Sequence, residues 1–216
     1  MNKATVKVVN KHAVVIVVSC ASMAFMNLDA HSTTVQWTVA DGGNGHFYDR
    51  VDVSTPISWA DAKLQAEGLS FMGTAGHLTT FTSLQELDFV ETRLFTALPR
   101  WLGGYQDRQA SDYSEPAGGW KWVTGETWSF TAWSTPTVGG NDVEPNNFGG
   151  SEDLLSTETS TFGGHNYLRW NDYGEGVRLN GFYVEYPAPV PEPEPSGLLI
   201  AGVALLALVA RRCATR

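Results

Sequence analysis

The sequence predicts an α+β fold in which two helices pack on small antiparallel sheets and a long irregular loop region precedes the closing strand. Two segments in the first half of the chain have the three- and four-residue apolar spacing of amphipathic helices. Short segments rich in β-branched and aromatic residues lie before, between and after them. Residues 125–164 have little periodicity and are rich in Gly, Ser, Thr, Pro and Asn. A long irregular segment inside a compact domain is typical of a functional loop or of disorder.

Both predicted helices have a serine at the N-cap position. Ser58 can cap the first helix, whose apolar positions are Trp59, Ala62, Ala66 and Leu69. Ser83 and Glu86 have the spacing of a capping box, in which the two side chains satisfy free amides of the first helical turn. The apolar stripe of this second helix is expected to be buried and consists of Leu84, Leu87, Val90 and Leu94.

Seven segments suit β-strands because they combine β-branched, aromatic and apolar residues over short lengths. They are residues 35–39, 46–51, 76–81, 100–105, 120–123, 166–171 and 181–186. The segments lie before, between and after the predicted helices, and the last one closes the domain. No internal repeat is visible among them.

The folded part of the chain is predicted to be one acidic domain, residues 31–186. It holds every Trp and Tyr of the 216-residue chain, with 20 Asp and Glu against 8 Lys and Arg. This balance gives the domain a formal charge of −12, against −9 for the whole chain. A surface of this sign repels phosphate backbones and attracts cations. We therefore expect no nucleic-acid partner and expect a bound cation.

Residues 1–30 have the pattern of an export signal. Three lysines and an apolar run over residues 13–25 are followed by small residues suited to cleavage, with Ala30 as the preferred cut site. The alternative is a lipoprotein signal, because Cys20 follows small and apolar residues. Both interpretations place the protein outside the cytoplasm.

The two cysteines of the chain, Cys20 and Cys213, both lie outside the predicted domain. Disulfides therefore cannot stabilise the domain, although exported proteins often use them. Its stability must come from the burial of aromatic side chains, and a bound ion would add to it.

Residues 187–216 form a separate tail. Alternating prolines predict an extended spacer, and residues 197–210 are almost wholly apolar before Arg211 and Arg212. Roughly 14 apolar residues are fewer than the ~20 of a comfortable membrane span. Composition alone therefore indicates a short anchor with its positive end inside.

The tail resembles the PEP-CTERM sorting signal of exported bacterial proteins. The matching residues are Val190, Pro191, Glu192 and Pro193, the apolar run 198–209, and Arg211 with Arg212. The resemblance implies a Gram-negative host and an exosortase-type membrane protease that recognises the tail during export. It also implies transient or permanent membrane insertion of the tail, and display at the cell surface or in an extracellular polysaccharide matrix.

Three polar motifs follow one another in the second half of the domain: Glu144-Pro145-Asn146, Glu152-Asp153 and Trp170-Asn171-Asp172. Their carboxylate and amide oxygens are hard ligands of the kind that hold calcium. Each motif alone is more typical of a turn or of a solvated acidic surface. In this order, on an acidic domain, they predict a calcium site.

The order of elements and motifs resembles that of a C-type lectin-like domain over residues 36–186. The matching segments are 59–62, 76–78, 101–103, 120–125, 144–146, 170–172 and 181–186. The resemblance implies that one calcium ion, Ca²⁺, is held by Glu144, Asn146, Glu152, Asn171 and Asp172. It also implies that hydroxyls of a sugar complete the shell of the ion. The implied sugar-binding residues are Glu144, Asn146, Glu152 and Asn171.

The Glu-Pro-Asn stretch carries two further implications of this resemblance. The peptide bond before Pro145 is expected to be cis, which turns both flanking side chains toward the ion. The order Glu144, Pro145, Asn146 is typical of lectins that select mannose, glucose, N-acetylglucosamine or fucose. We therefore expect a mannose-type preference.

The chain departs from this family where two disulfides are usual. Ala66 and Val184 stand at one bridge, which apolar packing could replace. Leu154 stands at the second bridge, with its partner position near Glu175. Bound calcium would then carry more of the ordering of the long loop.

A second calcium site, present in some family members, is not expected in this chain. Asn147 and Asp153 match part of it, but Thr124 and Trp128 replace further acidic ligands.

The long loop region is also expected to shape the sugar site. Residues 156–165 are predicted to form a loop that shapes or blocks it. Trp128, Trp133 and Phe148 are candidates for stacking on a sugar ring. The remaining tryptophans of the first two-thirds are expected in the core: Trp37, Trp59, Trp101, Trp120 and Trp122.

The sequence thus predicts an exported, calcium-dependent carbohydrate-binding protein whose partner is a glycan or polysaccharide. The alternative is a lectin-like protein-binding or matrix-structural module that binds no sugar. Catalysis is not expected, because metal-bound carboxylates are poor proton shuttles and the five histidines have neither metal spacing nor a nucleophile partner.

Overall fold

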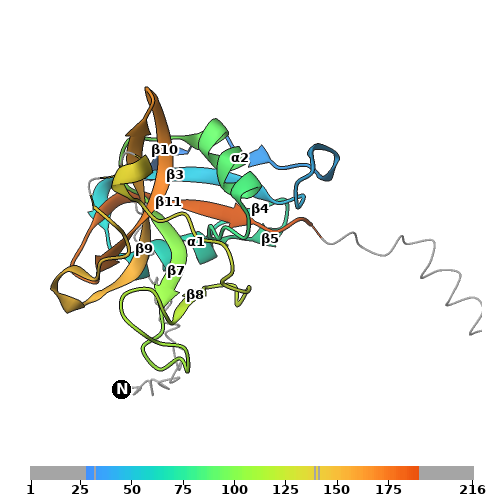
Figure 1. Ribbon diagram of the computed structural model, residues 1–216. Helices are drawn as coiled ribbons and strands as arrows, with labels where there is room; N and C mark the ends of the chain where they lie inside the picture. Colours follow the sequence, from blue (N-terminus) through green and yellow to red (C-terminus); the bar gives the residue numbers. More distant parts are fainter. Residues whose placement is uncertain (1–27, 32, 139, 141, 190–216) are drawn as a thin grey trace, which may run out of the picture.

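The computed structural model describes residues 28–31, 33–138, 140 and 142–189 (Figure 1). The helices are α1 (Trp59–Gly68) and α2 (Leu84–Leu94). The strands are β1 (Leu28–His31), β2 (Val35–Gln36), β3 (Phe47–Ile57), β4 (Ser70–Phe71), β5 (Thr74–Ala75), β6 (His77–Leu78), β7 (Trp101–Gln106), β8 (Trp120–Trp122), β9 (Glu152–Phe162), β10 (His165–Gly174) and β11 (Leu179–Tyr186). Short 3-10 helices are Val39–Asp41, Pro136–Val138 and Phe148–Gly150. The predicted α+β class is confirmed.

Nine strands of the described residues form one sheet, whose main order is β1-β3-β11-β7-β9-β10. β2 pairs with β3, β6 with β11 and β8 with β7, while β4 and β5 form a separate two-stranded sheet. The pairing is antiparallel as predicted, except that Phe182 of β11 pairs in parallel with Trp101 of β7. The closing strand β11 therefore joins the first long strand, β3, to the strands that carry the long loop (Figure 1).

Both helices begin where their serines predict. The Ser58 side chain accepts the amide of Asp61 at 3.1 Å, and the Ser83 side chain accepts the amide of Glu86 at 3.2 Å. The capping box of α2 is only half formed, because the Glu86 carboxylate accepts the amide of Thr82 instead of that of Ser83. Glu86 is 2% exposed, so this residue of the predicted capping box is a buried acid.

The core consists of two clusters of buried side chains. α2 contacts β3 and β10 and covers the larger cluster, which is Tyr48, Phe81, Leu87, Val90, Leu94, Leu102, Trp120, Trp122, Leu155, Leu168, Trp170 and Tyr183. α1 contacts β6, β7 and β11 and covers the other, which is Val51, Ile57, Ala62, Ala66, Leu78, Trp101, Leu179, Phe182, Val184 and Tyr186. Ala66 and Val184 both pack in the second cluster, where apolar contact occupies the place of the missing disulfide.

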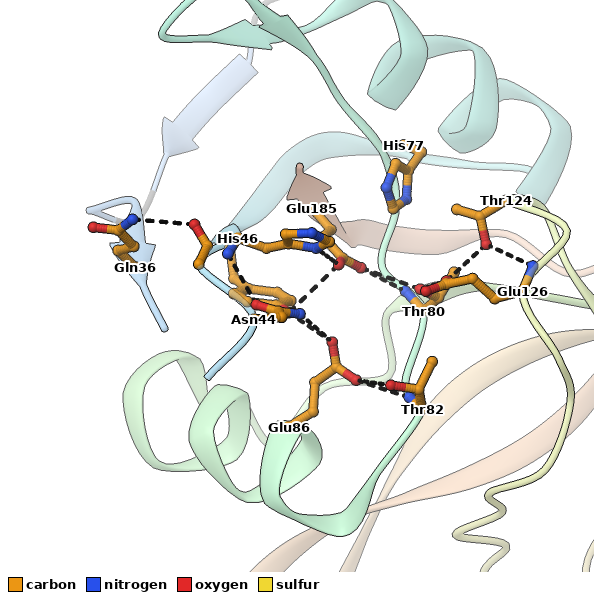
Figure 2. Close-up of polar contacts among 12 residues, drawn as sticks. Gln36, Asn44, His46, His77, Thr80, Thr82, Glu86, Thr124, Glu126 and Glu185 are labelled. Carbon is orange, nitrogen blue, oxygen red and sulfur yellow. Dashed lines mark hydrogen bonds and ion pairs between the residues drawn. The ribbon is translucent and has the colours of Figure 1, made fainter. Parts of the chain in front are cut away.

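A buried polar network ties α2 to β3 and β11 (Figure 2). The Glu86 carboxylate accepts hydrogen bonds from Tyr48, Asn44 and Thr82. The Glu185 carboxylate of β11 accepts the Thr80 amide, and His46 Nδ1 lies 2.6 Å from its Oε1. We refer to these residues as the Glu86–Glu185 network.

Part of the predicted irregular region is regular structure. β9 occupies residues 152–162 and pairs with β10, with Ser156 opposite Asn171. The prediction of a loop over residues 156–165 is therefore wrong, because these residues form most of β9, its turn and the first residue of β10. The segment is rich in Thr and Ser, and β-branched threonines suit a strand although they give no apolar signal.

Candidate functional site

The long loop between β8 and β9 is attached along the free edge of β10. The Trp170 amide donates to the Ala132 carbonyl at 2.9 Å, and the Ser134 amide donates to the Trp170 carbonyl at 2.9 Å. The Glu144 amide then donates to the Ser134 carbonyl at 2.9 Å. Three backbone hydrogen bonds thus fix the position of Glu144 relative to the strand that carries Asn171 and Asp172.

Aromatic packing holds the same loop against the core. Trp128 lies 4.4 Å from Trp122, ring centroid to ring centroid, and Trp133 meets Trp170 edge to face at 5.7 Å. Trp128 and Trp133 are therefore partly buried members of the core rather than exposed sugar platforms, which corrects their prediction. Aromatic pairs of this kind each contribute roughly 0.5–1.5 kcal/mol beyond burial. They order the loop without a disulfide.

The other aromatic predictions divide between core and surface. Trp101, Trp120 and Trp122 are buried as expected, while Trp37 and Trp59 are only partly buried. Phe148 is 81% exposed beside the Glu-Pro-Asn turn. Of the three residues predicted to stack on a sugar ring, Phe148 is the one that lies at the surface.

The Glu-Pro-Asn turn is anchored by Asp172. The Glu144–Pro145 peptide bond is cis, the geometry that the family resemblance implies. The Asp172 side chain is fully buried, and its two oxygens accept the amides of Asn146 at 3.1 Å and Asn147 at 2.8 Å. Asp172 therefore holds the turn through charge-assisted hydrogen bonds.

Glu152 closes the turn from the other side. Its Oε2 accepts the amide of Phe148 at 2.6 Å, and its own amide donates to Asn147 Oδ1 at 3.1 Å. Burial raises the pKa of Glu152, the Phe148 amide lowers it, and the charge of Asp172 raises it. Asp172 of β10 and Glu152 of β9 thus hold the same short turn through its backbone amides.

Glu144 is the least satisfied acid of the site. Its side chain is 7% exposed, and its Oε2 is buried without a hydrogen-bond partner. The pKa of Glu144 is raised to about 8, first by burial, then by the charge of Asp172 and a hydrogen bond with it, and then by the charges of Glu158 and Glu152. We refer to Glu144, Glu152, Glu158 and Asp172 as the Glu144 cluster.

The structure brings the predicted ligands together unequally. Glu144, Glu152 and Asp172 influence one another electrostatically, and the backbone of Asn146 contacts Asp172. Asn171 joins them only as the neighbour of Asp172 in β10, where its carbonyl accepts the Ser156 hydroxyl at 3.4 Å. No three His, Cys, Asp or Glu side chains among the described residues already converge as a metal site.

The residues nevertheless fit a hard cation. Asp172 and Glu152 face backbone amides, but each carboxylate has about four lone-pair sites, so amide bonds leave room for a metal ion. The buried Glu144 Oε2 has no other partner, and the side-chain oxygens of Asn146 and Asn171 supply neutral ligands of the type that calcium takes.

Sequence reasoning missed Glu158 as a member of the cluster. Its Oε2 is also buried without a hydrogen-bond partner. It was missed because residues 156–165 were expected to form a loop. The signal was the alternation in β9, where residues of even number share one face of the strand.

Arg108 occupies the neighbourhood of the unexpected second calcium site. Its guanidinium pairs with Asp153 at 2.9 Å and donates to the Gly150 carbonyl at 3.2 Å. Thr124 donates to Glu126 at 2.8 Å. An arginine thus supplies positive charge at the one acid that matched that site.

The positions of the second missing disulfide border a small pocket. Its volume is about 370 Å³, and its lining residues are Ser58, Trp59, Ala60, Leu154, Glu175 and Arg178. Leu154 and Glu175 both line this pocket, whereas Ala66 and Val184 are fully buried in the second cluster.

The predicted export signal and sorting signal lie almost wholly outside the described residues. These include Cys20, Val190, Pro191, Glu192, Pro193, Arg211 and Arg212. The preferred cut site, Ala30, lies within β1, where it pairs with Asp52 of β3. In the part of the chain that the structure describes, no helix is long and apolar enough to cross a membrane.

Comparison with known proteins gives the following similarities. No family model matches the chain. The chain is 33% identical over 170 residues to halomucin of Haloquadratum walsbyi, a match that covers 73% of this chain and 2% of halomucin. It therefore spans about 2% of the length of this curated relative.

Several solved structures of C-type lectins are similar in shape. The C-type lectin CEL-I from Cucumaria echinata is 18% identical, with 68% of this chain and 93% of CEL-I covered and a TM-score of 0.49. The C-type lectin domain of murine dendritic cell inhibitory receptor 2, solved with an N-glycan, is 20% identical, with 65% and 89% covered and a TM-score of 0.47. Human lithostathine is 15% identical, with 71% and 96% covered and a TM-score of 0.49.

Proposed function

We propose that the described domain is a C-type lectin-like module that binds a carbohydrate through one calcium ion at the Glu144 cluster. The observation that carries this proposal is the buried Glu144 oxygen without a partner, beside two other carboxylates. A buried charge without compensation costs several kcal/mol. Calcium would supply the compensating charge and would leave coordination positions for adjacent sugar hydroxyls.

Each side chain has a distinct role in this proposal. The carboxylates of Glu144, Glu152 and Asp172 coordinate the ion and balance its positive charge. Asp172 also fixes the turn through the Asn146 and Asn147 amides. Asn146 and Asn171 supply neutral oxygens, and their NH₂ groups can donate to a sugar hydroxyl. The carboxylates of Glu144 and Glu152 can accept a hydrogen bond from the same hydroxyl.

We propose a mannose-type preference from the order Glu144, Pro145, Asn146. Phe148 adds an exposed aromatic ring next to this turn, suited to the apolar face of a sugar. The protein acts by binding, without catalysis.

The second candidate is a lectin-like structural module that binds neither calcium nor sugar. It is favoured by Asp172, because both of its oxygens already accept backbone amides and the turn is closed without an ion. The two candidates differ in one measurable property, the response to calcium.

A glycan panel with and without chelator tests the proposal. The full-length protein should bind mannose-type glycans only with calcium, and the double variant Glu144→Ala, Asn146→Ala should not bind. Glu67→Ala, an exposed acid on α1, serves as the matched control and should bind like wild type. Calcium-insensitive binding, or galactose preferred over mannose, would overturn the proposal.

We also propose that the protein is exported by its N-terminal segment and displayed at the cell surface or in the extracellular matrix through its C-terminal tail. Mass spectrometry of the protein from its native host tests this directly. The expected mature chain begins at His31, and replacing Arg211 and Arg212 by Gln should prevent surface display. A cytoplasmic chain with an intact N-terminus would contradict it.

A further inference from the structure

We propose that Glu158 is a further ligand of the cation at the Glu144 cluster, so that the site extends inward along β9 beyond the residues implied by family resemblance. This inference rests on the proposed calcium site and concerns a residue outside the predicted ligand set. With Glu158, the site would contain four carboxylates instead of the three that the family resemblance implies.

The placement of Glu158 follows from β9 and the attached loop. Alternate residues of a strand share a face, so Ser156, Glu158 and Ser160 point to the same side. The Ser160 hydroxyl lies 3.1 Å from the Ser134 hydroxyl, and the Ser134 carbonyl accepts the Glu144 amide at 2.9 Å. Two residues of a strand span about 6.6 Å. Glu158 is therefore on the face of β9 that the Glu144-bearing segment covers.

Two buried oxygens on this face lack partners. They are Glu144 Oε2 and Glu158 Oε2, and both are excluded from solvent. Glu144 is 7% exposed, and neither oxygen has a hydrogen-bond donor. A cation between the two oxygens would satisfy both.

The nearest basic residue across the sheet is engaged elsewhere. Arg169 is opposite Glu158 in the β9–β10 register. Its guanidinium donates to the Leu168 carbonyl, lies 5.0 Å from the Tyr167 ring centroid and approaches Glu91 at 3.9 Å. These contacts draw Arg169 toward α2, so it does not serve as the counter-ion of the buried Glu158 oxygen.

Isothermal titration of the full-length protein with calcium chloride tests the role of Glu158. Glu158→Gln keeps the shape of the side chain and removes its charge, and calcium affinity should fall about tenfold or more. Glu67→Gln makes the same charge change at an exposed position on α1 and should leave the affinity within twofold. Without calcium, Glu158→Gln should unfold at the same temperature as wild type or higher.

The outcomes separate this inference from the proposed function. Calcium binding by wild type with equal affinity in Glu158→Gln overturns the role of Glu158 and leaves the calcium site standing. Absence of calcium binding by wild type overturns both. If Glu158→Gln does not fold, Glu158→Asp takes its place, because it retains charge but withdraws the oxygens by one methylene. Weaker binding by that variant supports the inference, and wild-type affinity overturns it.

Discussion

Two buried acidic groups in this domain differ in how their carboxylates are satisfied. In the Glu86–Glu185 network every carboxylate oxygen has a hydrogen-bonding partner (Figure 2). In the Glu144 cluster, Glu144 and Glu158 each keep a buried oxygen with no partner. Both groups are acidic and both pack on the same sheet, so burial alone does not explain the contrast.

The difference separates a structural role from a binding role. Tyr48, Asn44 and Thr82 donate hydrogen bonds to both oxygens of the Glu86 carboxylate. The network therefore joins α2 to two strands without a bound ligand. The Glu144 cluster keeps two buried oxygens without a partner, and it includes Glu152, which accepts the amide of the exposed Phe148. A complete network stabilises a fold, whereas an incomplete one is suited to hold a ligand.

The largest expected effect is in the complete network. Glu86→Ala leaves the Thr82 amide without its acceptor and leaves the Tyr48 hydroxyl only its 3.4 Å contact with Glu185. The free energy of unfolding should therefore fall by about 3–5 kcal/mol. Asp88→Ala, an exposed acid on the same helix, should change it by less than about 0.5 kcal/mol. Urea unfolding measures both. A loss below about 1 kcal/mol in Glu86→Ala would show that the network is not a structural unit.

A smaller, pH-dependent effect is expected at His46. The hydrogen bond with Glu185 raises the pKa of His46 and burial lowers it, with a net rise. The protonated pair therefore stabilises the fold below the ordinary pKa of histidine, and this contribution is lost as the pH rises through the raised value. His46→Asn should lower the thermal midpoint more at pH 6 than at pH 8.5. A difference in thermal midpoint between wild type and His46→Asn that grows with rising pH would contradict this assignment.

In the absence of calcium, a substitution at Glu144 is expected to stabilise the fold, opposite to the substitution at His46, although both contributions fall as the pH rises. The pKa of Glu144 is raised, so its stabilising contribution is present at low pH and lost as the pH rises through about 8. Glu144→Gln should therefore stabilise the calcium-free protein by about 1 kcal/mol, and more at pH 8.5 than at pH 5. Thermal unfolding in chelator measures the difference. Destabilisation by this variant in chelator would place Glu144 with the structural acids.

The smallest effect on stability is expected at Phe148. Because its ring is 81% exposed, Phe148→Ala should change the free energy of unfolding by less than about 0.5 kcal/mol. Sugar affinity should fall about 2- to 12-fold if the ring stacks on the ligand. Leu64→Ala, on the exposed side of α1, provides the control. Unchanged sugar affinity would remove Phe148 from the binding surface.

The sequence predicted those parts of the fold that have local signals. Ser58 and Ser83 marked both helix starts, and the apolar stripe of α2 is buried at Leu87, Val90 and Leu94. The prediction is wrong at Leu84, which is 49% exposed in the first turn of the helix. β9 was missed because its alternation is between Thr and Ser rather than between apolar and polar residues. The burial of Glu86 was not predicted, because the spacing of a capping box does not show that Tyr48 donates a hydrogen bond to its carboxylate.

The candidate site was predicted in part for the same reason. Glu144, Glu152 and Asp172 belong to recognisable motifs, and Asp172 and Glu152 both accept backbone amides of the turn that follows Glu144. Glu158 and Ser134 enter the site only through the pairing of β9 with β10 and the attachment of the loop. Trp128 and Trp133 were expected at the surface because a glycine- and serine-rich loop gives no sign of a packed aromatic cluster.

Calcium titration of the full-length protein, followed by intrinsic tryptophan fluorescence, tests the central claim most directly, because Trp133 and Trp170 lie on the loop and strand that carry the cluster. Wild type and Tyr48→Phe should show the same saturable change, and Glu144→Ala with Asn146→Ala should show none. The account is contradicted if wild type gives no saturable change, or if the change is lost in Tyr48→Phe and kept in the Glu144, Asn146 double variant.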